Sequence, residues 1–271
     1  MLALSTDYRS SHGDVMPYLR AIAAAGFTHI HWCQEWDTDY LYADEEIRAI
    51  GAGLREYGLR LSDLHASSGQ AANWGALQEE SRRAGVTLVA NRLDMTARLG
   101  GDAIILHLPA GFCLPPYDAA VRAASYRSLD DLLPVVRATG VRIALENMHK
   151  DNFAAIKELL HAYGPELLGL CYDAGHGNMA GNGLRRLADV TAHLLALHLH
   201  DNDGLSDQHR LPFTGTVDWA RLTALLADSP YRKPLTLEVI AQPEEEDTVF
   251  LKTAWEAGER LTAMVADAMT S

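Results

Sequence analysis

Short apolar runs alternate with longer amphipathic stretches from one end of the chain to the other. Each short run has the length of a buried strand, and in each longer stretch the apolar positions recur at the spacing of a helix. Runs that are apolar at nearly every position are typical of strands covered on both faces. Eight runs predict strands: LALS from Leu2, THIHW from Thr28, LRLSDLH from Leu59, AIILHL from Ala103, RIALE from Arg142, LLGLCYD ending at Asp173, LLALHLH from Leu194 and LTLEV from Leu235.

The stretches between these runs predict helices. They cover about residues 15–26, 44–58, 74–99 and 117–140, and a last stretch reaches the C-terminus. Gly26, Gly58 and Gly140 stand at the ends of three of them, as expected at helix C-termini. Asp44 and Asp218 are predicted N-caps, because a short carboxylate can accept hydrogen bonds from the free N–H groups of a first turn.

Strands alternating with helices predict an α/β fold with a parallel sheet. Eight such units close naturally into a (β/α)₈ TIM barrel, and no linker or shift in composition divides the chain, so we expect residues 1–271 to form a single domain. A doubly wound open sheet is the alternative. Two observations disfavour it. The segment after the first run is TDYRSSHGD, which is not a glycine-rich phosphate loop, and no G-x-G-x-x-G motif follows any predicted strand.

Composition allows a large core and limits the partners. Of 271 residues, 48% are hydrophobic and 22% charged, and the formal net charge is −13. Phosphate backbones and anionic lipids repel so acidic a chain, which predicts neither nucleic acid nor membrane as a partner. No run approaches the roughly 18 apolar residues of a membrane span, and the N-terminal segment does not resemble a signal peptide, so we expect a cytoplasmic protein. Cys33, Cys113 and Cys171 are too few and too scattered for a disulfide framework and are expected to be reduced.

Polar residues concentrate at the carboxyl ends of the predicted strands, where the active site of such a barrel forms. One such residue alone could be a structural hydrogen-bonding group or a helix cap. Six consecutive polar ends would be costly in desolvation and charge repulsion without a compensating cation. From the third strand onward these ends carry His65, His107, Glu146, Asp173, His198 with His200, and Glu238, with His176, Asp207 and His209 in the loops beyond.

Four of these residues, one from each of the last four strands, form a candidate ligand set: Glu146, Asp173, His198 and Glu238. Three carboxylates and one imidazole suit a divalent metal such as Mn²⁺, Zn²⁺, Co²⁺ or Mg²⁺, with positions left open for a substrate. Residues two apart on a strand face the same side, so His198 and His200 remain alternatives from the residues alone. Asp201 and Asp203 are interpreted as turn residues of the following loop.

Several short motifs occur in order at these positions. They are Leu145-Glu146-Asn147, Asp173-Ala174-Gly175-His176, His198-Leu199-His200-Asp201, the segment DQHRLPFTGTVDW and Leu237-Glu238-Val239. Together with GFTHIHWCQEWDTDYLYADEEI near the N-terminus, they resemble the xylose isomerase-like TIM-barrel superfamily, which contains sugar and sugar-phosphate isomerases and epimerases and also endonuclease IV. The resemblance implies a metal held by Glu146, Asp173, His198 and Glu238, and the His-x-x-Asp spacing favours His198 over His200.

The resemblance also implies roles for the remaining polar residues. Histidines around the metal would contact substrate: His65, His107, His176, His200 and His209. In endonuclease IV, residues corresponding to His65, His107, His176, Asp207 and His209 complete a trinuclear zinc cluster. The stretch 211–219 departs from the Leu-Pro-Gly-x-Gly-x-x-Asp-Trp pattern of the isomerase-like members at Phe213 and Thr216. We expect Trp32 to contribute to substrate binding by stacking on a sugar, with core packing as the alternative for it, Trp36 and Trp74.

Three functions follow as hypotheses. The first is a metal-dependent isomerase or epimerase of a small sugar or sugar derivative, in which the metal stabilises an enediolate and Glu146 and Glu238 act as general base and acid. The second is an endonuclease IV-like zinc phosphodiesterase acting on abasic DNA, which the acidic segments CQEWDTDYLYADEE and AQPEEEDTV disfavour. The third is a non-catalytic carbohydrate- or metal-binding module, which would not need both glutamates. The sequence leaves open the sugar and its phosphorylation, isomerase against epimerase, the metal and its count, and the oligomeric state, a homo-oligomer included.

Overall fold

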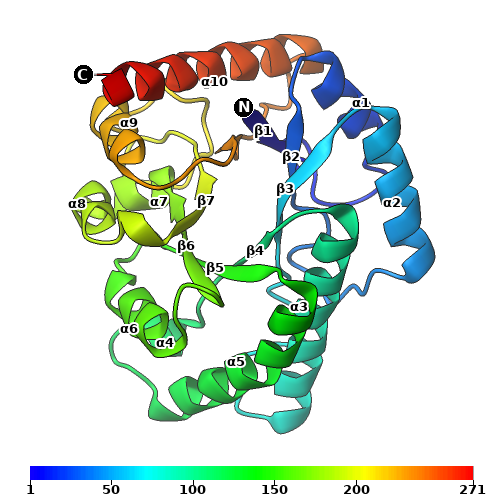
Figure 1. The fold of residues 1–271 in the computed structure, drawn as a ribbon, viewed down its shortest axis with the longest axis vertical. Helices are drawn as coiled ribbons and strands as arrows, with labels where there is room; N and C mark the ends of the chain where they lie inside the picture. The colour runs from blue at the N-terminus through cyan, green and yellow to red at the C-terminus, as the bar shows by residue number, and fades with distance from the viewer. Residues whose placement is uncertain (271) are drawn as a thin grey trace.

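Eight parallel strands alternate with helices through residues 1–270, which the computed structural model describes (Figure 1). Each of the eight predicted runs forms a strand, and nearly every strand residue is buried. The strands are β1 (Leu2–Ser5), β2 (His29–Trp32), β3 (Arg60–His65), β4 (Ala103–Leu106), β5 (Arg142–Glu146), β6 (Leu168–Asp173), β7 (Leu194–His198) and β8 (Leu235–Leu237).

The strands close into a barrel. Hydrogen-bonded neighbours follow the order β7-β6-β5-β4-β3-β2-β1-β8. An isolated bridge between Leu199 and Leu237 joins the two ends: the Leu199 N–H donates to the Thr236 carbonyl at 2.9 Å, and the Glu238 N–H donates to the Leu199 carbonyl at 3.2 Å. The predicted (β/α)₈ TIM barrel is therefore confirmed.

Helices surround the strands on all sides (Figure 1). The longer ones are α1 (Met16–Ala24), α2 (Asp44–Glu56), α3 (Glu79–Leu99), α5 (Ala119–Thr139), α6 (Phe153–Tyr163), α9 (Trp219–Asp228) and α10 (Asp247–Thr270). The short ones are α4 (Ala110–Cys113), α7 (Ala174–Met179), α8 (Gly183–Ala188) and the 3₁₀ helix η1 (Thr191–His193). None of the helices within residues 1–270 is long and apolar enough to cross a membrane.

The helix boundaries agree with the predicted signals except at two starts. Gly26, Gly58 and Gly140 follow their helices with φ of +103°, +68° and +72°, as expected for C-terminal glycines. The Asp218 carboxylate caps α9 by accepting from the Arg221 N–H at 3.0 Å. The prediction for Asp44 is wrong by one residue: Ala43 is the N-cap, and its N–H donates to the Glu46 carboxylate at 2.8 Å. Helix α3 begins at Glu79 and not at 74, because a turn precedes it in which the Asn73 side chain accepts from the Gly75 N–H.

Alternation of side chains along the strands divides the core into two regions. Large apolar side chains on the outer faces, such as Ile30, Leu64 and Leu145, belong to the core shared with the helices. A separate small cluster comes from β4 to β7: Ala103, Ile105, Ala144, Cys171, Leu195 and Ala196. On β2 and β3 the alternate positions carry His31 and Asp63, both fully buried. One side of the barrel interior is therefore polar beneath the mouth.

Candidate active site and metal centre

The carboxyl ends of the strands bring together the residues that the sequence singles out. His65, Glu146, Asp173 and His198 end β3, β5, β6 and β7, while His107 and Glu238 directly follow β4 and β8. A cavity of about 600 Å³ opens over these ends. Seven of the polar residues singled out by the sequence line it: His65, His107, Glu146, His176, Asp207, His209 and Glu238.

Four side chains converge on one point beneath this cavity. The Nδ1 atom of His198 lies 3.3 Å from Glu146 Oε1, 3.3 Å from Glu238 Oε2 and 3.9 Å from Asp173 Oδ2. One donor atom from each of the four residues lies within 4.8 Å of the other three. None of the four residues is more than 9% exposed. The donors therefore share a place that is shielded from bulk water.

The two glutamates have pKa values shifted in opposite directions. Burial raises the pKa of Glu238 well above its ordinary value, and the carboxylates of Glu146 and Asp173 add to the rise. Burial also acts to raise the pKa of Glu146, but the imidazoles of His198 and His107 outweigh it and hold that pKa well below the ordinary value. Carboxylates packed this closely repel one another, and a cation among them would relieve the repulsion.

This donor set fits a divalent cation. Two donors each about 2.1 Å from one cation lie about 3 Å apart when they subtend a right angle. The 3.3 Å separations around His198 Nδ1 are close to that spacing. Glu146, Asp173, His198 and Glu238 would hold the ion, and three carboxylates with one imidazole are donors that Mn²⁺, Zn²⁺, Co²⁺ and Mg²⁺ accept.

His198 faces this point, and His200 does not. The His200 ring is fully buried with Nε2 3.1 Å from Asp173 Oδ2, and it stacks on His209 at 4.0 Å between ring centroids. His200 is outside the cavity lining and orients the Asp173 carboxylate through Nε2, and its contact with substrate stays a prediction. Its ring also accounts for the glycine in Asp-Ala-Gly-His, since a Cβ on Gly175 would lie 2.0 Å from His200 Cε1.

Two further groups of polar residues flank the four candidate ligands. His65 Nε2 and His107 Nε2 lie 3.8 Å and 2.9 Å from Glu146 Oε2. On the other side, His176 Nε2 and His209 Nε2 lie 3.1 Å and 3.4 Å from Asp207 Oδ2. Burial alone would lower the pKa of His209, but the carboxylates of Asp207 and Glu238 raise it to about 10. The cavity therefore offers imidazole groups on two sides of the ligand set.

Trp32 does not reach the cavity. Its side chain is 1% exposed in β2, and the indole N–H donates to the Tyr42 hydroxyl at 3.0 Å. The structure favours the core-packing alternative for Trp32, because alternation along the strand turns it away from the side that His31 occupies, and its role in substrate binding stays a prediction. Trp36, four residues on, lines the cavity and packs on His65 with ring centroids 5.0 Å apart. Trp74 is buried at 4% exposure, outside the lining.

The cavity wall also contains residues that the motifs do not mark. Asp7 and Arg9 come from the loop after β1, and Met148, His149 and Ile240 follow β5 and β8. Arg9 Nε donates to Asp247 at 2.6 Å, and its guanidinium also binds the carbonyls of two residues in the loop before α10. Because Asp7 and Arg9 follow β1 directly, the rule that barrel sites form at strand ends could have identified them.

The sequence of the chain is similar to a protein family and to individual proteins of known organisms. A family model described as "Xylose isomerase-like TIM barrel" matches residues 19–255. The protein y4fM of Sinorhizobium fredii is 31% identical over 279 residues, which cover 92% of this chain and 89% of y4fM. A probable endonuclease 4 of Oleidesulfovibrio alaskensis is 30% identical over 172 residues, which cover 55% of this chain and 58% of that protein.

Solved structures with the same fold include sugar epimerases. An L-ribulose 3-epimerase superposes with a TM-score of 0.79 at 17% identity, covering 98% of this chain and 95% of the epimerase. A D-tagatose 3-epimerase-like protein and a 3-keto-D-glucoside 4-epimerase from E. coli are similar as well. At such low identities, the likeness to these structures shows a shared architecture.

Proposed function

The chain belongs to the family of xylose isomerase-like TIM barrels, and on that premise we propose that it is a divalent-metal-dependent isomerase or epimerase of a small sugar. One observation carries the proposal: Glu146 and Glu238, from β5 and the end of β8, converge with Asp173 and His198 under an open cavity. Moving a proton between the carbons or faces of a sugar needs a base and an acid held beside its carbonyl group. The sugar epimerases of the same fold support this assignment.

The two glutamates are placed both to hold a cation and to move a proton. Glu146 turns Oε1, and Glu238 turns Oε2, toward His198 Nδ1, so each carboxylate keeps a second oxygen. We assign proton exchange with the sugar carbon to these second oxygens, acting from opposite faces. The second oxygen of Glu146 lies 2.9 Å from His107 Nε2, which links this carboxylate to an imidazole of the cavity wall. A divalent cation, when bound, would polarise the sugar carbonyl and the adjacent hydroxyl as a Lewis acid.

The cavity wall suits a small polyhydroxylated ligand. Its volume of about 600 Å³ lies within the range of about 300–1,000 Å³ that is usual for small-molecule sites. The imidazoles of His65 and His107 can donate hydrogen bonds to sugar hydroxyls or accept them, whereas His176 and His209, whose pKa values are raised by neighbouring carboxylates, can donate them. Trp36 adds an apolar surface against which the C–H face of a sugar can pack.

Deuterium exchange tests the proposal. The metal-loaded protein is incubated with a panel of free ketoses and aldoses in deuterated water, and mass spectrometry measures carbon-bound deuterium. We expect one sugar to gain deuterium and to yield its isomer or epimer. Glu238→Gln should abolish the exchange, whereas Glu244→Gln, at an exposed site in the next loop, should preserve it. A metal-loaded protein that exchanges no carbon-bound proton of any sugar in the panel would contradict the proposal.

A second candidate is a phosphodiesterase similar to endonuclease IV. It is favoured by the additional donors beside the ligand set, since ligand atoms of His65, His107 and Glu146 lie within 4.8 Å of one another and His176, Asp207 and His209 are neighbours. The charge around the cavity opposes it. Glu35, Asp37 and Asp39 lie in the β2–α2 loop, and Arg9 is engaged by Asp247. Because phosphate contacts supply most of the affinity for DNA, we rank this function second.

Metal counting and DNA cleavage separate the two candidates. We expect one divalent ion per chain by elemental analysis and no incision of a duplex with an abasic site at physiological salt. Three zinc ions per chain together with incision would establish the nuclease, because in-line phosphodiester cleavage uses metals at both the attacking and the leaving oxygen.

A further inference from the structure

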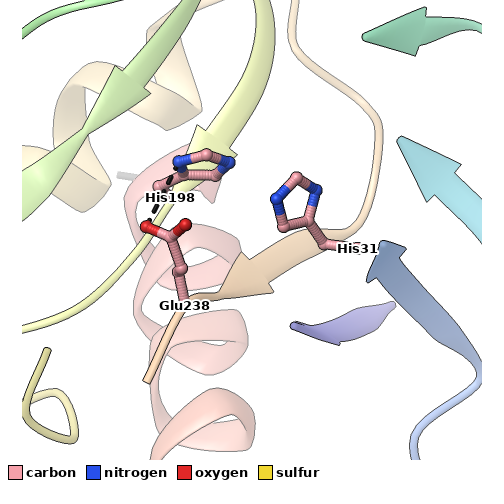
Figure 2. Close-up of side chains that lie close together, drawn as sticks. All are labelled: His31, His198 and Glu238. Atoms are coloured by element: carbon pink, nitrogen blue, oxygen red, sulfur yellow. Dashed lines mark ion pairs between the residues drawn. The ribbon is translucent and has the colours of Figure 1, made fainter. Parts of the chain in front are cut away.

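A second buried histidine lies behind His198. His31, on β2, is fully buried, and its ring centroid is 4.6 Å from that of His198, with the ring planes at 56°. Figure 2 shows a nitrogen of each ring turned toward the other ring, while the opposite nitrogen of His198 pairs with Glu238. A ring nitrogen of each histidine and a carboxylate oxygen of Glu238 lie within 4.8 Å of one another.

Asp63 determines which nitrogen of His31 is available. His31 Nδ1 lies 2.6 Å from Asp63 Oδ1, and the Ser62 hydroxyl donates to Asp63 Oδ2 at 3.1 Å. Burial acts to raise the pKa of Asp63, but the hydrogen bond from His31 acts against it and contributes to holding the pKa below its ordinary value. An ionised carboxylate only accepts, so Nδ1 of His31 is the donor and Nε2 of the neutral ring is left as an acceptor.

The nitrogen of His198 that faces His31 needs such an acceptor. Nδ1 of His198 points at Glu146 and Glu238, so a cation there would take the Nδ1 lone pair and leave the ring proton on Nε2. A metal-binding histidine nearly always donates its second N–H to a carboxylate, a carbonyl or water. Within residues 1–270, Nε2 of His198 and Nε2 of His31 are both buried without a hydrogen-bond partner.

We propose that His31, held by Asp63, accepts the hydrogen bond from Nε2–H of His198 and so fixes His198 in the tautomer that presents Nδ1 to the cation. His31 is a positioning residue, because it lies outside the cavity lining and acts through His198. The inference rests on the proposed function, since it takes the four-residue set as the cation site. It adds a chain of three buried side chains, Asp63, His31 and His198, that leads from the barrel interior to the cation.

Two substitutions of His31 separate this role from packing. His31→Gln keeps an acceptor oxygen near the position of Nε2, whereas His31→Phe has a similar size and no acceptor. Both remove the imidazole Nδ1–H that Asp63 accepts, but only the Gln amide brings an N–H that can replace it. By isothermal titration, we expect the affinity for Zn²⁺ to fall about 10–100-fold in His31→Phe and no more than about threefold in His31→Gln.

Stability and spectroscopy complete the test. Urea unfolding of the cation-free proteins should show a larger loss of stability for His31→Phe, which leaves the Asp63 carboxylate without a donor. In the Zn²⁺-loaded wild type with ¹⁵N-labelled histidine, NMR should find the ring proton of His198 on Nε2 and that of His31 on Nδ1. This measurement decides the question if His31→Phe does not fold, and a proton on Nε2 of His31 would overturn the inference.

The same titrations distinguish failure of the inference from failure of the proposed function. If the wild type binds Zn²⁺ and His31→Phe binds it equally well, the inference alone is overturned. If the wild type binds no Zn²⁺, both the metal centre and the positioning role are overturned.

Discussion

At the residue scale, two aspartates two positions apart have different roles. Asp203 is exposed and accepts from the N–H groups of Leu205 and Ser206, as the turn interpretation expects. Asp201 is fully buried, and its carboxylate accepts from the Val217 N–H at 3.0 Å and from the Trp219 indole at 2.8 Å. Asp201 therefore holds the long loop between β7 and α9, which carries Asp207 and His209, against the barrel.

Removing these two carboxylates should have unequal effects on stability. Asp201→Ala leaves three N–H donors, those of Asn202, Val217 and the Trp219 indole, without their acceptor and should lower the free energy of unfolding by about 3 kcal/mol. Asp203→Ala exposes its donors to water and should cost less than about 1 kcal/mol. Urea unfolding followed by circular dichroism measures both. Equal losses would show that Asp201 does not anchor the loop.

Substitutions of the two tryptophans of the β2 region should affect different properties, substrate binding for Trp36 and stability for Trp32. Trp36→Ala removes an aromatic surface of the cavity and should raise KM about 3–10-fold with little change in kcat. Trp32→Phe removes the indole donor to Tyr42 and should lower the free energy of unfolding by about 1–2 kcal/mol while KM stays unchanged. Steady-state kinetics on the sugar found by deuterium exchange is the measurement. A raised KM in Trp32→Phe would show that Trp32 contributes to substrate binding.

At the element scale, helix α3 supports the wall of the cavity. Arg92 on α3 is fully buried and donates to the Tyr40 carbonyl at 2.9 Å and the Glu35 carbonyl at 3.3 Å. Its guanidinium also lies 4.5 Å over the Tyr42 ring. These contacts hold the β2–α2 loop, from which Trp36 reaches the cavity. The first turns of α3 also support the segment before it, because Gly85 lets the backbone at Asn73 and Trp74 lie directly on the helix.

The loss of stability caused by replacing a helix glycine with alanine should therefore depend on the atoms that the new methyl group meets. A Cβ on Gly85 would lie 2.1 Å from the Trp74 backbone nitrogen, so Gly85→Ala should cost about 3 kcal/mol or more through overpacking. In α2, a Cβ on Gly51 meets only side-chain atoms at 3.2 Å and 3.4 Å. Gly51→Ala should be within about 1 kcal/mol of the wild type, since the better helix propensity of alanine offsets the contact. Thermal and urea unfolding compare the pair, and equal stabilities would contradict the close packing at Gly85.

At the scale of the whole molecule, the barrel concentrates negative charge at its mouth. The chain carries a formal net charge of −13, and the four-ligand set brings three carboxylates to one buried point. Their mutual repulsion opposes folding in the absence of a cation. A bound divalent ion should therefore stabilise the fold as well as serve the site.

Metal removal should lower the melting temperature. At a free ion concentration of roughly 1,000 times Kd, binding to the folded state alone stabilises it by about 4 kcal/mol. For a chain of this size that corresponds to a rise of about 10 °C over the protein treated with EDTA. Differential scanning calorimetry with Mn²⁺ and Zn²⁺ measures the shift, and Glu238→Gln should show a smaller one. Equal melting temperatures with and without metal would remove the cation from the four-residue set.

The sequence by itself determined the eight strands, the barrel and most residues at its mouth. Apolar periodicity is a local property that reports burial, and in a parallel barrel all strands end at one rim. Polar residues at consecutive strand ends, such as Glu146 and Glu238, could therefore be placed in one cavity without coordinates. The exact helix starts were less predictable. Helix α2 is capped by a hydrogen bond from the Ala43 N–H to the Glu46 carboxylate, and alanine is not a residue that usually marks an N-cap.

Tertiary structure alone decided which of the candidate side chains meet. It turned His198 toward the carboxylates and His200 toward Asp173, and it sent Trp32 outward while Trp36 reached the cavity. The register between β2 and β3 shifts after Ile30 and places His31 opposite Asp63, although the two are 32 positions apart. A shift of one residue in register moves every following side chain to the other face. Contacts across strands are set by that register and by closure of the barrel, which no local pattern contains.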